Sequence, residues 1–229
     1  MKIIKPLLLL TSLVLPGLAL AGNQMYEPLS ASVRASLHKA VADNASPKHA
    51  FISSADGEAW LNSMSKRVER RFPDAAQRHE FLSTVYYEAT RAGLDPQMVL
   101  GLIQVESGFK KYAVSSASAR GYMQIMPFWV KLIGAEDHNL FHMRTNLRFG
   151  CTILRHYVDI EKGNLYRALG RYNGSLGQPE YPNLVLGAWK NNWVWNDTPK
   201  NKTAEQTSAK KPGYLLIASS VPTVAKHNA

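Results

Sequence analysis

Residues 95–108 read DPQMVLGLIQVESG, and this stretch predicts an amphipathic helix with one carboxylate on its apolar face. Asp95 is a favourable N-cap residue, and Pro96 suits the first helical position. The positions i, i+3, i+4 and i+7 of one helix face are Val99, Leu102, Ile103 and Glu106. We therefore expect the carboxyl of Glu106 to lie against a hydrophobic core, near the end of a helix.

Two interpretations of Glu106 are open from its spacing alone. It can be an ordinary surface glutamate that pairs with Lys110 or Lys111. It can also be a desolvated acid, because burial and the negative end of the helix dipole both disfavour the ionised form and raise the pKa. A glutamic acid that stays protonated near neutral pH is suited to protonating the leaving oxygen of a glycosidic bond.

Nearly all other periodic segments have helical spacing, and no convincing strand alternation appears before the C-terminal tail. The expected helices begin near Ser30, span Trp60–Val68, run from Asp74 to Gly93, run from Thr145 or Asn146 to Gly163, begin at Asn164, and run from Pro182 into a cluster of Trp189, Trp193 and Trp195. The fold class predicted from these patterns is mainly α.

The first 21 residues have the pattern of a secretory signal peptide. Lys2 and Lys5 precede an apolar run over residues 7–20, and Ala19-Leu20-Ala21 is a small-x-small cleavage site. No cysteine follows the run to carry a lipid, and no later segment is long and apolar enough to span a bilayer. We expect a periplasmic or secreted protein with no integral membrane segment in the mature chain.

The chain is strongly basic and has a single cysteine. Its formal charge of +10 attracts polyanions, and outside the cytoplasm these are the carboxylates and phosphates of the cell envelope. Signatures of nucleic-acid-binding domains are absent from the sequence, so nucleic acid is not an expected partner. Cys151 has no partner for an intramolecular disulfide, so stability must come from packing.

Three motifs occur in order along the chain, and the first of them begins at Glu106. Glu106-Ser107-Gly108-Phe109 is followed by Gly121-Tyr-Met-Gln-Ile-Met-Pro127 and then by Tyr172-Asn173-Gly174. This succession resembles the catalytic domain of soluble lytic transglycosylases, whose helical fold is shared with goose-type lysozymes. The resemblance runs from about Asp74 to Trp195. It implies a mainly α, lysozyme-like helical domain.

The resemblance implies a role for six residues. It makes Glu106 the single catalytic acid and base, with no cofactor. It implies substrate-binding roles for Ser107, Met123, Gln124, Tyr172 and Asn173, with Tyr172 close to the catalytic carboxyl. Amides and hydroxyls suit sugar hydroxyl and acetamido groups, although a core position for Met123 and a simple turn at Asn173-Gly174 are the alternatives.

The reaction implied by the resemblance is cleavage of the β-1,4 bond between N-acetylmuramic acid and N-acetylglucosamine in peptidoglycan, with 1,6-anhydro-N-acetylmuramoyl ends as product. A lysozyme-like hydrolase stays open as an alternative, since Asp137, Asp159, Glu161 and Glu180 could supply a second carboxylate. A non-catalytic glycan-binding accessory protein of a secretion system also stays open. An envelope or secretion-machinery partner is possible on this basis, but the sequence identifies none.

A metal site is the weaker interpretation of His138 and His142. The two histidines are four residues apart and Asp137 is adjacent, but no matching third ligand follows at motif spacing, so we expect no metal.

The predicted organisation is a signal peptide (1–21), an N-terminal helical extension (22–73), a catalytic domain (74–195) and a polar, weakly ordered tail (196–229). The short apolar patch at residues 214–218 belongs to no predicted element.

Overall fold

The structure is a computed structural model that describes residues 24–42 and 55–195. The predicted signal peptide, the tail and its apolar patch at residues 214–218 lie outside the described residues. Within the described ranges the chain is helical and contains no β-strand, which confirms the mainly α prediction. Two isolated antiparallel bridges, Val114 with Arg120 and Arg120 with Ile125, are the β-type pairings that these ranges show.

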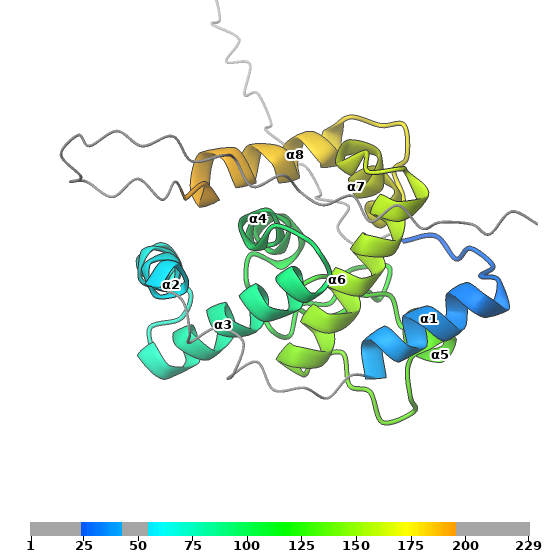
Figure 1. Ribbon diagram of the computed structural model, residues 1–229, viewed down its shortest axis with the longest axis horizontal. Helices are drawn as coiled ribbons and strands as arrows, with labels where there is room; N and C mark the ends of the chain where they lie inside the picture. Colours follow the sequence, from blue (N-terminus) through cyan, green and yellow to red (C-terminus); the bar gives the residue numbers. More distant parts are fainter. Residues whose placement is uncertain (1–23, 43–54, 196–229) are drawn as a thin grey trace, which may run out of the picture. The chain divides into compact units, whose positions relative to one another are not determined.

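Eight α-helices and one π-helical turn make up the described part of the chain (Figure 1). They are α1 (Ala31–Ala42), α2 (Ala55–Val68), α3 (Ala75–Arg91), α4 (Pro96–Ser107), α5 (Phe128–Ile133), α6 (Met143–Ile160), α7 (Leu165–Asn173), α8 (Glu180–Ala188) and the π-helical turn η2 (Trp189–Trp193). None of the described helices is long and apolar enough to cross a bilayer.

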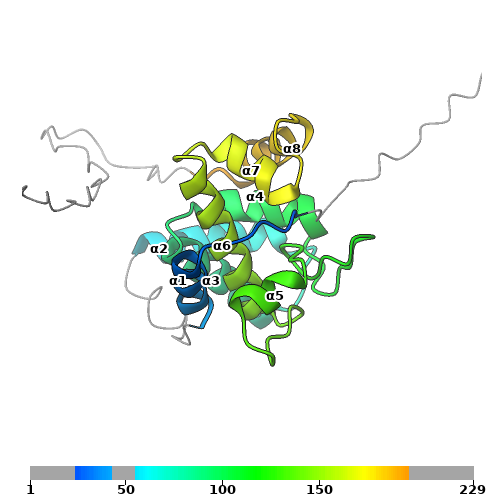
Figure 2. The same cartoon turned by 90° about the vertical axis from the view of Figure 1, so that its right-hand side faces the viewer.

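Helix α6 is the centre of the packing, with α1, α3 and α7 against it (Figures 1 and 2). Helices α1 and α2 share its hydrophobic core, since Leu37, Val41, Trp60 and Met64 belong to the same buried cluster as the later helices. The predicted N-terminal extension therefore packs into this cluster at both of its helices.

Helix α4 lies between α3 and the layer formed by α8 and η2. The approach of α4 to this layer is unusually close at Gly101, where a Cβ atom would come within 2.9 Å of the backbone nitrogen of Trp189. Because only glycine leaves room for this contact, Gly101 sets the distance between α4 and the start of η2.

The starts of two helices differ from the sequence predictions, and one helix was not predicted. Helix α6 begins at Met143 with His142 as N-cap, earlier than the predicted Thr145 or Asn146. Helix α8 begins at Glu180, two residues before the predicted Pro182. Pro182 is tolerated inside the first turn, because its missing N–H costs no helical hydrogen bond there. The short helix α5 was not predicted, because its six residues are too few to show a period.

The core contains a buried charge cluster around Glu88 of α3. Arg148 of α6 donates from Nη2 to Oε1 of Glu88 over 2.9 Å, and Arg91 donates from Nε to Oε2 over 3.0 Å. Arg144 lies 3.8 Å from the same carboxylate. Buried ion pairs need such multiple partners to offset the loss of hydration, and this one joins α3 to α6.

Candidate active site

Helix α4 carries Glu106 to the centre of the domain, as its sequence predicts. The Asp95 side chain accepts hydrogen bonds from the amides of Gln97 and Met98, so the helix starts with a fixed cap. At the other end Gly108 adopts a left-handed conformation and ends the helix directly after Ser107. Glu106 is only 5% exposed in the last turn.

The Glu106 carboxyl has one hydrogen-bond partner among the described residues. The hydroxyl of Tyr181 donates to its Oε1 over 2.5 Å, whereas Oε2 is buried and finds no hydrogen-bond partner there. No described cation forms a salt bridge with Glu106, unlike the arginine-paired Glu88. Burial raises the pKa of Glu106 to about 8, and the hydrogen bond from Tyr181 offsets part of this rise. The structure therefore favours a protonated carboxyl at neutral pH.

Tyr181 comes from the first turn of α8, which packs along α4. Burial, together with the Glu106 carboxyl, raises the pKa of Tyr181 well above its usual range, so the phenol stays a hydrogen-bond donor. The sequence analysis did not identify this residue. Its contact with Glu106 joins residues 75 positions apart, and no local pattern signals such a contact.

Ser107 joins the end of α4 to the loop at residues 113–125. Its hydroxyl donates to the carbonyl oxygen of Tyr122 over 2.8 Å and to that of Ile103 over 3.2 Å. The Ser107 hydroxyl, for which the resemblance implies substrate binding, is thus bound to two backbone carbonyls. Its observed contacts position the 113–125 loop against the helix.

The 113–125 loop is closed by reciprocal backbone hydrogen bonds between Arg120 and Ile125, each 3.0 Å long. Gln124 lies in this turn with a φ of +50°, a left-handed conformation that costs energy for a residue with a side chain. Its Nε2 donates to the carbonyl oxygens of Gly121 and Ala113. The side-chain amide of Gln124, for which the resemblance implies substrate binding, is therefore held by hydrogen bonds within its own loop.

Asn146 of α6 holds this loop through hydrogen bonds of its side chain. Its Oδ1 accepts from the amide of Met123 over 2.8 Å, and its Nδ2 donates to the carbonyl oxygens of Arg120 and Leu140, each over 2.8 Å. Gly121 makes the approach possible, because a Cβ there would lie 2.4 Å from the Asn146 amide nitrogen. One buried side chain thus satisfies three backbone groups of the loop region.

Met123 and Tyr172 meet in the core beneath the loop. Met123 is fully buried, and its sulfur is so close to Gly150 of α6 that a Cβ at that glycine would lie 2.3 Å away. The Tyr172 hydroxyl donates to the carbonyl oxygen of Met123 over 2.7 Å. The side chain of Met123 therefore occupies the core position that was the alternative to a cleft lining.

Tyr172 lies near the carboxyl, but it is not the tyrosine that contacts it. Burial raises the pKa of Tyr172 well above its usual range, and the charge of Glu106 adds to this rise. Its hydroxyl is directed to Met123 as described, while Tyr181 donates to Glu106. Asn173 ends α7 and is buried, and its Oδ1 accepts from the hydroxyl of Ser175 over 3.4 Å.

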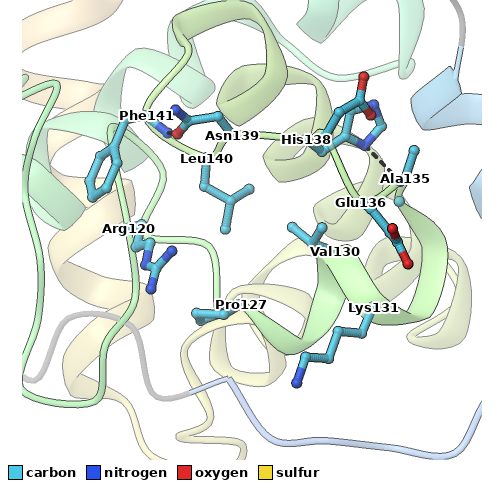
Figure 3. A pocket seen from close by; sticks show the side chains of 12 residues that line it. Arg120, Pro127, Val130, Lys131, Ala135, Glu136, His138, Asn139, Leu140 and Phe141 are labelled. Atoms are coloured by element: carbon cyan, nitrogen blue, oxygen red, sulfur yellow. Dashed lines mark hydrogen bonds between the residues drawn. The ribbon is translucent and has the colours of Figure 1, made fainter.

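A separate cavity of about 860 Å³ lies beside the 113–125 loop and is not lined by Glu106 (Figure 3). Arg120, Lys131 and Phe141 are among its lining residues, together with His138, whose Nδ1 accepts from the amide of Ala135. His142, which the sequence analysis weighed with His138 as a metal ligand, is the N-cap residue of α6. Among residues 24–42 and 55–195 no three metal-ligating side chains gather around one point.

Comparisons with known proteins find a family match for the region around Glu106. Residues 83–181 match the family described as "Transglycosylase SLT domain", a range that begins in α3 and ends at Tyr181. The chain is 29% identical over 102 residues to the "Transglycosylase" of Enterobacteria phage PRD1, which covers 44% of this chain and 37% of the phage protein.

Shorter and more distant similarities extend to bacterial proteins. The chain is 46% identical over 48 residues to the "Membrane-bound lytic murein transglycosylase C" of Actinobacillus pleuropneumoniae, which covers 21% of this chain and 13% of that protein. A solved structure of an inactive mutant of the lytic transglycosylase Slt from Pseudomonas aeruginosa has 23% sequence identity and a TM-score of 0.40, over 56% of this chain and 24% of that one.

The chain spans little more than a third of the phage relative and about an eighth of the Actinobacillus protein. The family match nevertheless falls on the motifs that carry the resemblance in the sequence, from the Glu106 helix to the end of the Tyr172 helix. The resemblance inferred from these motifs is therefore confirmed over residues 83–181, which match the transglycosylase SLT domain family.

Proposed function

We propose that this protein is a peptidoglycan lytic transglycosylase that cleaves the β-1,4 bond between N-acetylmuramic acid and N-acetylglucosamine. The observation that carries the proposal is the state of Glu106, a buried carboxyl with a pKa of about 8 in the region that matches the family. Such a group is a proton donor at neutral pH, which is what departure of a sugar oxygen requires. The names of the relatives point to the same substrate.

Glu106 acts twice in the proposed reaction. Its carboxyl first gives a proton to the glycosidic oxygen, the bond from that oxygen to C1 of N-acetylmuramic acid breaks, and N-acetylglucosamine leaves with a free 4-hydroxyl. The acetamido oxygen of the same muramic acid stabilises the positive charge that develops at C1. The Glu106 carboxylate then removes the proton of the C6 hydroxyl of this muramic acid, while the C6 oxygen forms a bond to C1. The product is a 1,6-anhydro end, and no water is consumed.

A single-carboxylate mechanism agrees with the surroundings of the other acidic residues that the sequence offered. Glu161 pairs with Arg167 and Arg171, and Asp159 pairs with Arg155. Asp137 and Glu180 are exposed. These four carboxylates are therefore either paired with arginines or exposed, and in the proposed route the substrate supplies the attacking group, its intramolecular C6 hydroxyl.

The remaining roles follow from the contacts of each residue. We infer that the 113–125 loop with Gln124 forms one wall of the glycan cleft, held by Ser107 and Asn146, and that Asn173 binds substrate at the end of α7. Tyr181 holds the Glu106 carboxyl in place, and Tyr172 supports the loop from beneath. We also infer export of the chain by its signal peptide to the periplasm or cell surface, where the charge of +8 that remains without Lys2 and Lys5 favours the anionic envelope.

The test combines one variant with one isotope. Glu106→Gln removes the transferable proton at nearly constant volume, so release of soluble fragments from purified sacculi should fall at least about a hundredfold, the usual scale of a lost general acid. A circular dichroism melt like that of the wild type is the required control. Residual activity within a few fold of wild type would remove Glu106 from the mechanism.

The wild-type digest is carried out in heavy-oxygen water and analysed by mass spectrometry. The proposed route yields anhydro ends without label, because the C6 oxygen forms the new bond. Reducing ends that carry the heavy oxygen as the main product would identify a lysozyme-like hydrolase instead.

A further inference from the structure

The segment before α1 lies on the wall of the proposed cleft and is attached there at three points. Gln24 is only 3% exposed although it belongs to no helix. The ring of Tyr26 packs edge-on against Phe128 of α5, with centroids 5.7 Å apart. Oε1 of Glu27 accepts from Nη1 of Arg171 of α7 over 2.7 Å. Figure 2 shows this blue segment running from α1 toward the loop that precedes α5.

The side chain of Gln24 engages a donor and an acceptor of the backbone at the same time. Its Nε2 donates to the carbonyl oxygen of Gln124 over 3.4 Å, and its Oε1 accepts from the amide of Met126 over 3.4 Å. Gln24 also lies close enough to Tyr172 to lower the pKa of its phenol. Gln24 therefore lies against the end of the 113–125 loop that carries Gln124.

The chemistry of this contact is that of an N-acetyl group. A carboxamide presents one carbonyl acceptor and N–H donors, and the acetamido group of an amino sugar presents the same pair. An acetamido group that approached Gln124 and Met126 would need the backbone carbonyl and amide that Gln24 already uses. The two cannot form these hydrogen bonds together.

We propose that Gln24 takes the place of one acetamido sugar in the cleft, so that residues 24–27 weaken the binding of any glycan long enough to reach Gln124 and Met126. This inference rests on the proposed function, since it assumes that the cleft binds an N-acetylated glycan. Gln24 is then a residue that sets which lengths of glycan the protein prefers.

The segment is held weakly enough for a glycan to displace it. Both hydrogen bonds of Gln24 are at the long end of the accepted range. The ion pair of Glu27 with Arg171 is partly exposed, with Glu27 at 41%, and such pairs contribute little. The segment therefore competes with long glycans and does not exclude them.

The experiment measures the binding of N-acetylglucosamine oligomers, from the disaccharide to the hexasaccharide, to the full chain. Every protein carries Glu106→Gln so that no oligomer is cleaved, and Gln24→Ala is compared with the unchanged Gln24. Affinity for the longest oligomers should rise about fivefold with Gln24→Ala, the scale of one net hydrogen bond. Affinity for the disaccharide should change by less than about twofold, because it can bind clear of the segment.

Two controls keep the outcomes separate. Gln77→Ala removes an exposed glutamine of α3 and should leave all affinities unchanged. In the absence of sugar, the Met126 amide resonance must move with Gln24→Ala, and an unmoved resonance would overturn the contact itself. Equal affinities at every oligomer length would overturn the inference while leaving the proposed function intact. Failure of every variant to bind any oligomer would contradict the glycan cleft and this inference together.

Discussion

At the scale of single residues, the site depends on one carboxyl and the phenol that donates to it. Burial pushes the pKa of Glu106 upward and the hydrogen bond from Tyr181 pulls it back, because the bond stabilises the ionised form more than the protonated form. The proposed reaction needs both forms in turn. Tyr181 thus keeps Glu106 from becoming too weak an acid to release its proton.

Tyr181→Phe tests this role, because it removes the donor and leaves the ring. The pKa of Glu106 should rise further above about 8, by about one pH unit for a hydrogen bond to a charged group. The alkaline limb of the pH profile of kcat/KM should move to higher pH by the same amount, with a lower maximum rate. The readout is the pH profile of glycan release, with a thermal melt as the folding control. An unmoved or acid-shifted limb would show that the phenol does not act on the carboxyl.

At the scale of elements, the 113–125 loop depends on a side chain from another helix. Asn146 satisfies the amide of Met123 and the carbonyls of Arg120 and Leu140; its bonds to Met123 and Leu140 are buried and its bond to Arg120 is partly buried. Leaving buried backbone groups unpaired costs more than the bonds contributed.

Asn146→Ala should therefore destabilise the fold by about 2–4 kcal/mol and lower activity as well, because the loop loses its support. Urea denaturation measures the first effect and fragment release from sacculi the second. Asn183→Ala, on the exposed side of α8, is the matched control and should lie within about 0.5 kcal/mol of wild type. If both variants cost the same, Asn146 is not the support of the loop.

The elements also show how far the sequence alone could lead. Helix α4 was predicted with its cap, its apolar face and its buried glutamate, because all three depend on residues close together in the chain. The start of α6 was misplaced because His142 caps it without a side-chain hydrogen bond, so no Ser, Thr, Asp or Asn marks the boundary. The start of α8 was misplaced because Pro182 is tolerated in a first turn.

Contacts between distant segments were beyond prediction from one sequence. Tyr181 and Gln24 meet the site from positions 75 and about 100 residues away from their partners, and nothing in their local sequence distinguishes them from surface residues. The resemblance named Tyr172 as the tyrosine near the acid, and the structure gives the direct contact to Tyr181. Packing of α8 on α4 decides this, not the pattern of either helix.

At the scale of the whole molecule, a buried neutral acid links the stability of the fold to pH. The pKa of Glu106 is about 8 in the folded state, against a model value of 4.5 for an exposed glutamate. Between these values the unfolded chain releases the proton that the folded chain retains. Stability should therefore be complete below the lower value and fall as pH rises toward the upper one, by up to about 1.4 kcal/mol per pH unit.

Glu106→Gln should remove this dependence, because the amide does not titrate. The variant should gain at least about 1 kcal/mol over wild type between about pH 5 and about pH 8, measured by denaturant unfolding at both values. Glu180→Gln, at an exposed carboxyl, is the control and should show no such gain. A gain that is larger at the acid end would reverse the sign and contradict the raised pKa.

The close approach at Gly101 ties the strength of the acid to the architecture. Gly101 lies five residues before Glu106, about 7.5 Å along the same helix, and touches the point where α8 passes into η2. Tyr181 belongs to α8, so the distance between α4 and α8 sets the length of its hydrogen bond to Glu106. A larger residue at position 101 should therefore change the pKa of Glu106, and with it the pH dependence of the proposed reaction, although Glu106 and Tyr181 themselves stay the same.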